Sequence, residues 1–247
     1  MSQESLKRTP PSEEYTEEYF LTDCGGFTDY LQGRLSLRHR KALEYLKVRR
    51  GEVILDVGCG RGELVRACSE QGAKTVGIDY SVAAVKISNV GSKVDNIVII
   101  RASATNLPFK EEIFDKAIML DIVEHLAPDD LMKCLKDVRR VLKKDGQVLI
   151  HTPNRWGDYA FSVYFKWASR FRANLKRVSM DFKPHRYAEL HVNVMDPVSL
   201  KAVLHCAGFD SRIWFAAHPL ENVPRQWLVI DKIFFFLTTI WCKAVRV

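Results

Sequence analysis

One short stretch of this 247-residue chain has the residue types and spacing of a nucleotide-like binding site. Residues 53–57 are apolar except for Asp56, which is typical of a buried parallel strand, and residues 58–62 carry glycine at every second position. Glycine allows positive φ angles and lets a ligand come close to the bare main chain. Residues 63–70 follow the apolar pattern of a helix. The stretch therefore predicts a strand, a glycine turn and a helix whose amino end presents N–H groups to the ligand.

Two acidic residues indicate which ligand this turn would hold. The glycine spacing is G-x-G-x-G and not the G-x-G-x-x-G of dinucleotide sites, and Asp56 stands two residues before the first glycine. A carboxylate there repels a pyrophosphate and suits an ammonium group. Asp79 ends the next apolar run, 23 residues after Asp56, where a carboxylate can accept both hydroxyls of a ribose. S-adenosylmethionine (SAM) meets both conditions; a glycine turn without a ligand and a NAD site are the alternatives.

This region resembles the class I SAM-dependent methyltransferases, whose first motif is commonly L-D-x-G-C-G-x-G. The resemblance runs from about residue 43 to residue 215 and implies strands near 96, at 114–121 and at 147–152. The family usually has an acid near position 103 that holds the adenine amino group, whereas this chain has Ser103, whose hydroxyl can still accept a hydrogen bond. The residues that we assign to the cofactor are Asp56, Gly58, Cys59, Gly60, Gly62, Asp79, Tyr80, Ser81, Ser103, Ala104, Asp121 and Ile122.

The resemblance implies an α/β fold: a Rossmann-like, seven-stranded, mostly parallel sheet with helices on both faces and an antiparallel last strand. A helix over 196–208 is predicted by an acid at its N-cap, a proline at N1 and a terminal glycine, and strands at 209–216 and about 240–247 follow it. We expect a single methyltransferase domain over residues 1–247. Its parts are an N-terminal helical lid (1–50), a SAM-binding core (51–152), a basic aromatic insertion (154–195) and a C-terminal helix with strands six and seven (196–247).

The expected lid carries Tyr15, Tyr19 and Phe20 and a predicted helix over about 35–46. In similar enzymes such a segment folds over SAM. The resemblance then implies that Arg34 or Arg38 meets the methionine carboxylate.

Asp121, Glu124 and His125 are the catalytic candidates, because they follow the predicted fourth strand. If the segment begins a helix, the three side chains share one face at spacings i, i+3 and i+4. His125 would be the general base that deprotonates a hydroxyl acceptor, since the pKa of histidine is near neutral. Alternatively Glu124 and His125 cap the helix and brace the SAM loop, or all three bind a divalent metal, as resembling quinone-pathway enzymes do. We assign no metal; His151, His185 and His191 are secondary candidates.

Most of the net charge of +7 falls after the predicted fifth strand. Residues 154–186 hold eight bases and two acids, a net of +6, together with many aromatic residues at helical spacing. This basic amphipathic segment lies where ligands bind in such sheets. It is interpreted as a lid over a hydrophobic small molecule, as a membrane-surface patch formed by 156–177 and 227–237, or as aromatic packing with a solvated basic face. Short pieces at 152–155 and 185–191 resemble the ubiquinone-biosynthesis type of O-methyltransferase.

We therefore expect a SAM-dependent methyltransferase that acts on a small hydrophobic or lipid-linked acceptor, with oxygen favoured over nitrogen or carbon. Nucleic acid is not favoured, because the chain lacks the N/D-P-P-Y/F motif after its fourth strand, and a non-catalytic SAM-binding scaffold is the remaining alternative. Six cysteines without metal spacing indicate a reducing compartment. With no signal peptide and no apolar run of membrane-spanning length, we expect a cytoplasmic protein, peripheral on the inner membrane face if the basic segment meets a bilayer. The oligomeric state is left open.

Overall fold

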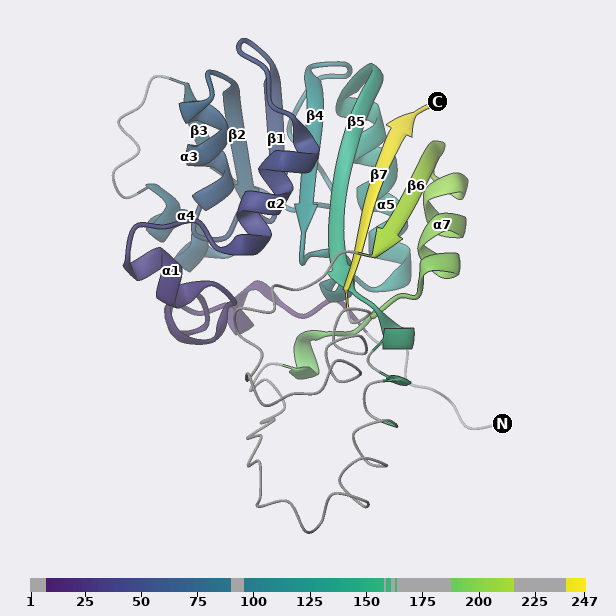
Figure 1. Ribbon diagram of the computed structural model, residues 1–247, viewed down its shortest axis with the longest axis horizontal. Helices are drawn as coiled ribbons and strands as arrows, with labels where there is room; N and C mark the ends of the chain where they lie inside the picture. Colours follow the sequence, from purple (N-terminus) through teal and green to yellow (C-terminus); the bar gives the residue numbers. More distant parts are fainter. Residues whose placement is uncertain (1–7, 90–95, 158, 161–162, 164–187, 216–238) are drawn as a thin grey trace.

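Seven strands form one sheet in the order β3-β2-β1-β4-β5-β7-β6. The computed structural model describes residues 8–89, 96–157, 159–160, 163, 188–215 and 239–247 (Figure 1). The strands are β1 (Val53–Val57), β2 (Lys74–Asp79), β3 (Ile97–Arg101), β4 (Phe114–Leu120), β5 (Leu142–Pro153), β6 (Phe209–Phe215) and β7 (Thr239–Arg246). Strands β1 to β5 pair in parallel, whereas β7 runs antiparallel to β5 and β6. The predicted mostly parallel sheet with an antiparallel last strand is confirmed.

Helices cover both faces of the sheet (Figure 1). They are α1 (Phe27–Leu31), α2 (Leu37–Leu46), α3 (Glu63–Glu70), α4 (Val82–Asn89), α5 (Pro128–Val141) and α7 (Pro197–Cys206). Alternate residues of a strand point to opposite faces, and β1 serves both layers. Leu55 packs into a core with α5 and α7, while the preceding Ile54 packs into a second core with α2 and α3.

The C-terminal helix α7 begins and ends close to the predicted residues. The carboxylate of Asp196 accepts hydrogen bonds from the N–H groups of Val198 and Ser199, each at 3.0 Å, and so satisfies two main-chain donors of the first turn. Gly208 follows the helix with φ +82°, a conformation that favours glycine. The capping residues, which can be recognised in the sequence, therefore determine where this helix begins and ends.

The expected helix beginning at Asp121 is wrong. Only one 3₁₀ turn, η3 (Val123–His125), forms there, and α5 starts at Pro128. A residue that precedes proline avoids the helical region, and Ala127 is extended with ψ 154°. Asp121 itself has φ +53°, so it does not share a helical face with Glu124 and His125.

Parts of the predicted substrate mouth lie outside the described residues. These parts are residues 164–187, which include His185 and most of the basic insertion, and residues 216–238, which include the apolar segment 227–237. Among the helices of the described residues, none combines the length and apolar character required to cross a bilayer.

Candidate active site

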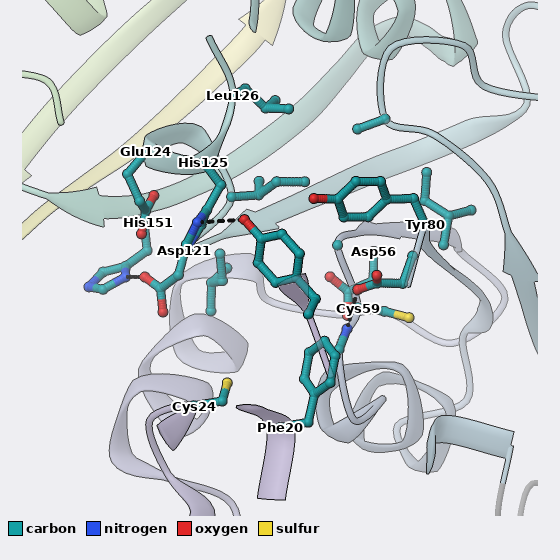
Figure 2. Close-up of a pocket in the computed structure, with 18 of the residues that line it drawn as sticks. Phe20, Cys24, Asp56, Cys59, Tyr80, Asp121, Glu124, His125, Leu126 and His151 are labelled. Carbon is teal, nitrogen blue, oxygen red and sulfur yellow. Dashed lines mark hydrogen bonds and ion pairs between the residues drawn. The ribbon is translucent and has the colours of Figure 1, made fainter. Parts of the chain in front are cut away.

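A cavity of about 420 Å³ opens at the carboxyl ends of β1, β2 and β4 (Figure 2). It lies where the strand order reverses around β1, which is the position at which open α/β sheets bind ligands. Its walls come from the N-terminal segment, the glycine turn after β1, the ends of β2 and β4, and the loop after β3. The assigned cofactor residues line it except Gly62 and Ser81, which lie just behind it.

The three glycines of the turn have positive φ angles, which are energetically unfavourable for other residues. Gly58, Gly60 and Gly62 have φ angles of +75°, +50° and +73°. A Cβ at Gly58 would stand 2.8 Å from Ile122 Cδ1, so the bare main chain is needed for the end of β4 to pack against the turn. Cys59 is buried, and burial raises the pKa of its thiol, which makes it a packing residue and not a nucleophile.

Asp79 joins the end of β2 to the glycine turn. One carboxylate oxygen accepts a hydrogen bond from Gly60 N–H at 3.0 Å and the other accepts one from Ser81 N–H at 2.9 Å. Burial nevertheless raises the pKa of this carboxyl to about 6. A carboxylate offers about four acceptor sites and the main chain uses three at most, so the group can also accept from a ligand hydroxyl.

Asp56 is a buried carboxylate that lacks a donor. It is 5% exposed, and none of the described residues donates a hydrogen bond to it. Burial, followed by the neighbouring Asp79 and Glu63, raises its pKa to about 7. A cationic ligand group beside Asp56 would relieve both the burial and the repulsion.

Arg61 fastens the N-terminal segment over the turn, and the sequence argument did not single it out. Its guanidinium donates to the carbonyls of Phe20, Cys24 and Gly25 at 2.7, 3.2 and 2.8 Å. It also pairs with Glu63 at 3.0 Å and is only 2% exposed. The only signal in the sequence was a charged residue at the variable position of the glycine motif.

Further contacts hold the predicted N-terminal lid and its aromatic residues against the glycine turn and the end of β2. Ser81 Oγ donates to the carbonyl of Tyr15 at 2.7 Å, and Tyr80 Oη donates to the carbonyl of Pro10 at 2.9 Å. The Phe20 ring reaches the turn, where a Cβ at Gly60 would meet it at 3.5 Å. Two residues assigned to the cofactor, Tyr80 and Ser81, therefore also hold the N-terminal segment.

Of the two arginines expected to meet the methionine carboxylate, only Arg38 lines the cavity. Arg34 pairs with Asp29 at the surface. Arg38 forms an ion pair with Asp121, yet its Nε is buried and has no hydrogen-bond partner in the described part of the chain. His39, beside it, likewise has a buried Nδ1 without a hydrogen bond, and burial followed by the Arg38 charge lowers its pKa to about 3.

Asp121 is engaged on both sides and is not free to act as a base. One oxygen pairs with Arg38 and the other with His151 Nδ1 (Figure 2). Burial alone would raise the pKa of Asp121, but the Arg38 guanidinium and His151 hold it well below the usual range. Asp121 thus orients two side chains of the cavity wall.

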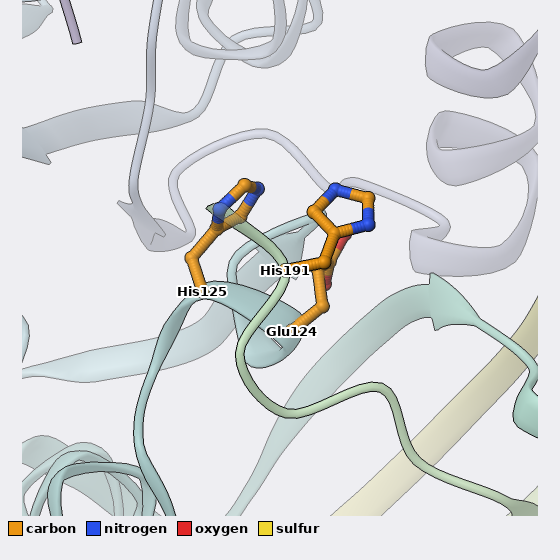
Figure 3. A group of neighbouring side chains, drawn as sticks. All are labelled: Glu124, His125 and His191. Atoms are coloured by element: carbon orange, nitrogen blue, oxygen red, sulfur yellow. The ribbon is translucent and has the colours of Figure 1, made fainter. Parts of the chain in front are cut away.

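Glu124 and His125 have hydrogen-bond partners other than those of Asp121. His125 Nδ1 lies 3.1 Å from the carbonyl oxygen of Leu190 and 2.9 Å from Tyr15 Oη. Burial, then His191, lowers the pKa of His125 to about 4. Glu124 accepts a hydrogen bond from Thr152 Oγ1 at 3.0 Å, and burial followed by Asp121 raises its pKa to about 8. Among the described residues, this pair and His191 form a group of potential metal ligands, which does not include Asp121 (Figure 3).

The unsatisfied polar groups fit SAM. Within the described residues, Arg38 Nε has no acceptor and the Asp56 carboxylate has no donor, and these groups are complementary to the carboxylate and ammonium of an amino acid. Asp79, which can accept a further hydrogen bond beside the turn, suits a ribose. Ser103, the predicted adenine contact, lines the cavity, and its hydroxyl bonds to Thr105 at 2.9 Å.

Comparisons with known proteins agree with this site. Residues 55–150 match the family model described as a methyltransferase domain. A demethylmenaquinone methyltransferase of Tropheryma whipplei is 27% identical over 179 residues, which are 71% of this chain and 73% of that protein. A ubiquinone biosynthesis O-methyltransferase of Histophilus somni is 34% identical over 109 residues, 41% of this chain and 45% of that protein. The chain spans about half the length of other relatives that it matches.

A solved structure shares the fold. In a complex between the Haloferax volcanii Trm112 methyltransferase activator and a putative methyltransferase, the matched chain is 16% identical, with a TM-score of 0.69 over 95% of this chain and 96% of that one. The fold and the position of the cavity agree with the match to the methyltransferase domain family. Residues 55–150 resemble that family, whose cofactor is SAM.

Asp79→Asn should weaken binding of both SAM and S-adenosylhomocysteine. The amide loses the charge and one acceptor oxygen, and a stranded buried polar group costs about 1–3 kcal/mol, or roughly 5- to 150-fold in affinity. Isothermal titration calorimetry would measure it. Asp210→Asn, an exposed change on β6, is the matched control and should bind as the parent does. Equal affinities in the two variants would contradict the role given to Asp79.

Binding of SAM should weaken as the pH falls. Only the ionised form of Asp56 attracts an ammonium group, and its pKa is about 7. Acidification from about pH 7.5 to about pH 5.5 protonates Asp56, so proton linkage predicts a rise in the dissociation constant of roughly 20-fold from this group alone. Asp56→Asn should bind more weakly at the higher pH and lose most of the pH dependence. Parallel pH curves for parent and variant would rule out this role of Asp56.

Proposed function

We propose that this protein transfers the methyl group of SAM to a small hydrophobic or lipid-linked acceptor, at an oxygen atom, and releases S-adenosylhomocysteine. The observation that carries the proposal is one cavity lined by two kinds of group. Arg38 and Asp56 suit an amino acid, and the imidazoles of His125 and His191 line the same cavity.

The protein's own contribution is positioning and proton transfer. SAM supplies an electrophilic methyl group on its sulfonium. Asp56, Asp79 and Arg38 hold the cofactor, and the hydrogen bonds of Arg61 hold the N-terminal segment over the site. Correct placement of an acceptor against the methyl accounts for much of the acceleration in such a displacement.

A hydroxyl acceptor also has to lose a proton. The Leu190 carbonyl can only accept a hydrogen bond, so the proton of neutral His125 resides on Nδ1 and the lone pair of Nε2 is available as a base. Its pKa is about 4 and not near neutral as the sequence argument assumed, so this imidazole is neutral at physiological pH but a weaker base than an ordinary histidine. His125 is therefore the proposed proton acceptor, while Asp121 positions Arg38 and His151.

The hydrophobic character of the acceptor is supported by exposed apolar and aromatic side chains that follow β5. Trp156, Tyr159 and Val163 follow β5 and are 51%, 72% and 48% exposed. Two relatives are named for demethylmenaquinone and ubiquinone, which are hydrophobic ring compounds. A cytoplasmic location with peripheral contact to the inner membrane face is part of the same proposal, since such an acceptor partitions into lipid.

Incubation with SAM and a panel of hydroxylated aromatic and lipid acceptors should release S-adenosylhomocysteine, measured by mass spectrometry. The Asp79→Asn variant is the control for cofactor dependence. Turnover with amine or carbon acceptors only would reject the oxygen preference. If the parent binds SAM but no acceptor gives S-adenosylhomocysteine above the rate without acceptor, the catalytic proposal fails.

Membrane contact predicts co-sedimentation with anionic liposomes. Binding should be lost when Arg170, Arg172, Lys176 and Arg177 become glutamate, because the bases would then repel the anionic surface. The matched control reverses four bases elsewhere on the surface, such as Lys133, Lys136, Lys144 and Lys201. Absence of parent binding, or equal loss in both variants, would reject a specific membrane patch.

A further inference from the structure

Glu124, His125 and His191 form a compact group of potential metal ligands inside the cavity. One ligand atom from each residue lies within 4.8 Å of the others. The two imidazoles lie side by side, with ring centroids 4.9 Å apart and an interplanar angle of 81°, and the Glu124 carboxylate lies next to them (Figure 3). All three side chains line the same cavity as the SAM residues.

We propose that Glu124, His125 and His191 bind one divalent transition-metal ion inside the cavity. Binding of the ion itself does not depend on the proposed function, whereas its role toward an oxygen acceptor rests on that function. With the ion bound, Nε2 of His125 is a ligand and no longer the base, so the ion replaces it in easing deprotonation of the acceptor, whose proton leaves to water. The group differs from the Asp121, Glu124 and His125 trio that the sequence suggested, because Asp121 is engaged by Arg38 and His151.

Main-chain hydrogen bonds hold the His191 segment against the turn that carries the other two ligands. The carbonyl oxygen of Glu124 accepts from the N–H groups of both Val192 and Asn193, at 2.9 and 3.0 Å. The Leu190 carbonyl accepts from His125 Nδ1. Bonds on both sides of His191 thus place it beside the turn before any ion binds, which lowers the ordering cost of assembling the site.

The hydrogen bond to Leu190 also prepares His125 as a ligand. It keeps the proton on Nδ1 and leaves the Nε2 lone pair free, which is the arrangement found around metal-binding histidines. Glu124 is oriented in the same way, because Thr152 Oγ1 donates to one of its oxygens while the carboxylate retains further lone pairs. Both side chains are almost fully buried, so their directions are fixed by packing.

The chemistry of the donors limits the ion. Two imidazoles with one carboxylate suit zinc, manganese, cobalt or iron(II) and are a poor set for calcium or magnesium, which prefer oxygen ligands. Three protein ligands leave coordination positions open for water or for a substrate oxygen. The acceptor class that fits such a site is a hydroxyl compound able to bind the ion through oxygen, because a bound hydroxyl loses its proton more easily.

Cobalt(II) is a direct probe, since its visible absorption reports the ligands around it. Titration of the chelator-treated full chain with Co²⁺ should give a saturable visible spectrum, and His191→Ala should weaken the affinity about tenfold or more. His205→Ala is the matched control, because His205 is exposed beside Cys206 and is a competing surface site. The proposal expects the parent spectrum in that control.

Calorimetry with SAM on each variant distinguishes loss of the site from loss of the fold, and His191→Gln provides a second, milder change. Retained SAM binding together with loss of the cobalt spectrum in both His191 variants supports the site. An unchanged spectrum in the His191 variants, loss in His205→Ala, or no saturable spectrum in the parent overturns it. Failure of methyl transfer with intact cobalt binding would count against the proposed function alone.

Discussion

The hydrogen bond between the Asp79 carboxylate and the Gly60 N–H joins the end of β2 to the glycine turn of β1, and the rest of the site depends on this junction. It holds a turn in which Gly58, Gly60 and Gly62 all have positive φ, and it places two buried carboxylates, Asp56 and Asp79, side by side. Burial, followed by the like charges of Asp79 and Glu63, raises the pKa of Asp56 to about 7. A cation beside Asp56 would offset both effects, which is the basis for the predicted contact with the ammonium group of SAM.

The N-terminal segment completes the cavity from the opposite side of the turn. Arg61 is the main link, because one buried guanidinium reaches three carbonyls of that segment and also pairs with Glu63. Truncating one partner of a buried ion pair leaves a charge without compensation, so a change at Arg61 would disturb the turn and the segment together. Closure of the site and the geometry of the glycine turn are therefore coupled through a single side chain.

Asp121 has different partners from those of Glu124 and His125, which follow it closely in the chain. Its left-handed backbone turns the chain sharply after β4, so its carboxylate meets Arg38 and His151, while Glu124 and His125 are directed toward His191. The two neighbouring acids have opposite pKa shifts. Arg38 and His151 lower the pKa of Asp121, whereas burial raises that of Glu124 to about 8. Such divergent environments allow neighbouring acids to serve different purposes.

The sequence by itself determined the strand, glycine turn and helix around Asp56, the acid at the end of β2, and the capped helix α7, because these depend on local apolar period, on turn chemistry and on capping. It did not determine the partners of residues far apart in the chain. Arg61 meets the Phe20 carbonyl 41 positions earlier, and His125 meets the Leu190 carbonyl 65 positions later. The helix expected at Asp121 failed because Pro128 excluded it, and the ligand group of Glu124, His125 and His191 exists only because main-chain hydrogen bonds bring two distant segments together. Local pattern decides which elements form, whereas packing and long-range hydrogen bonding decide which side chains face one another.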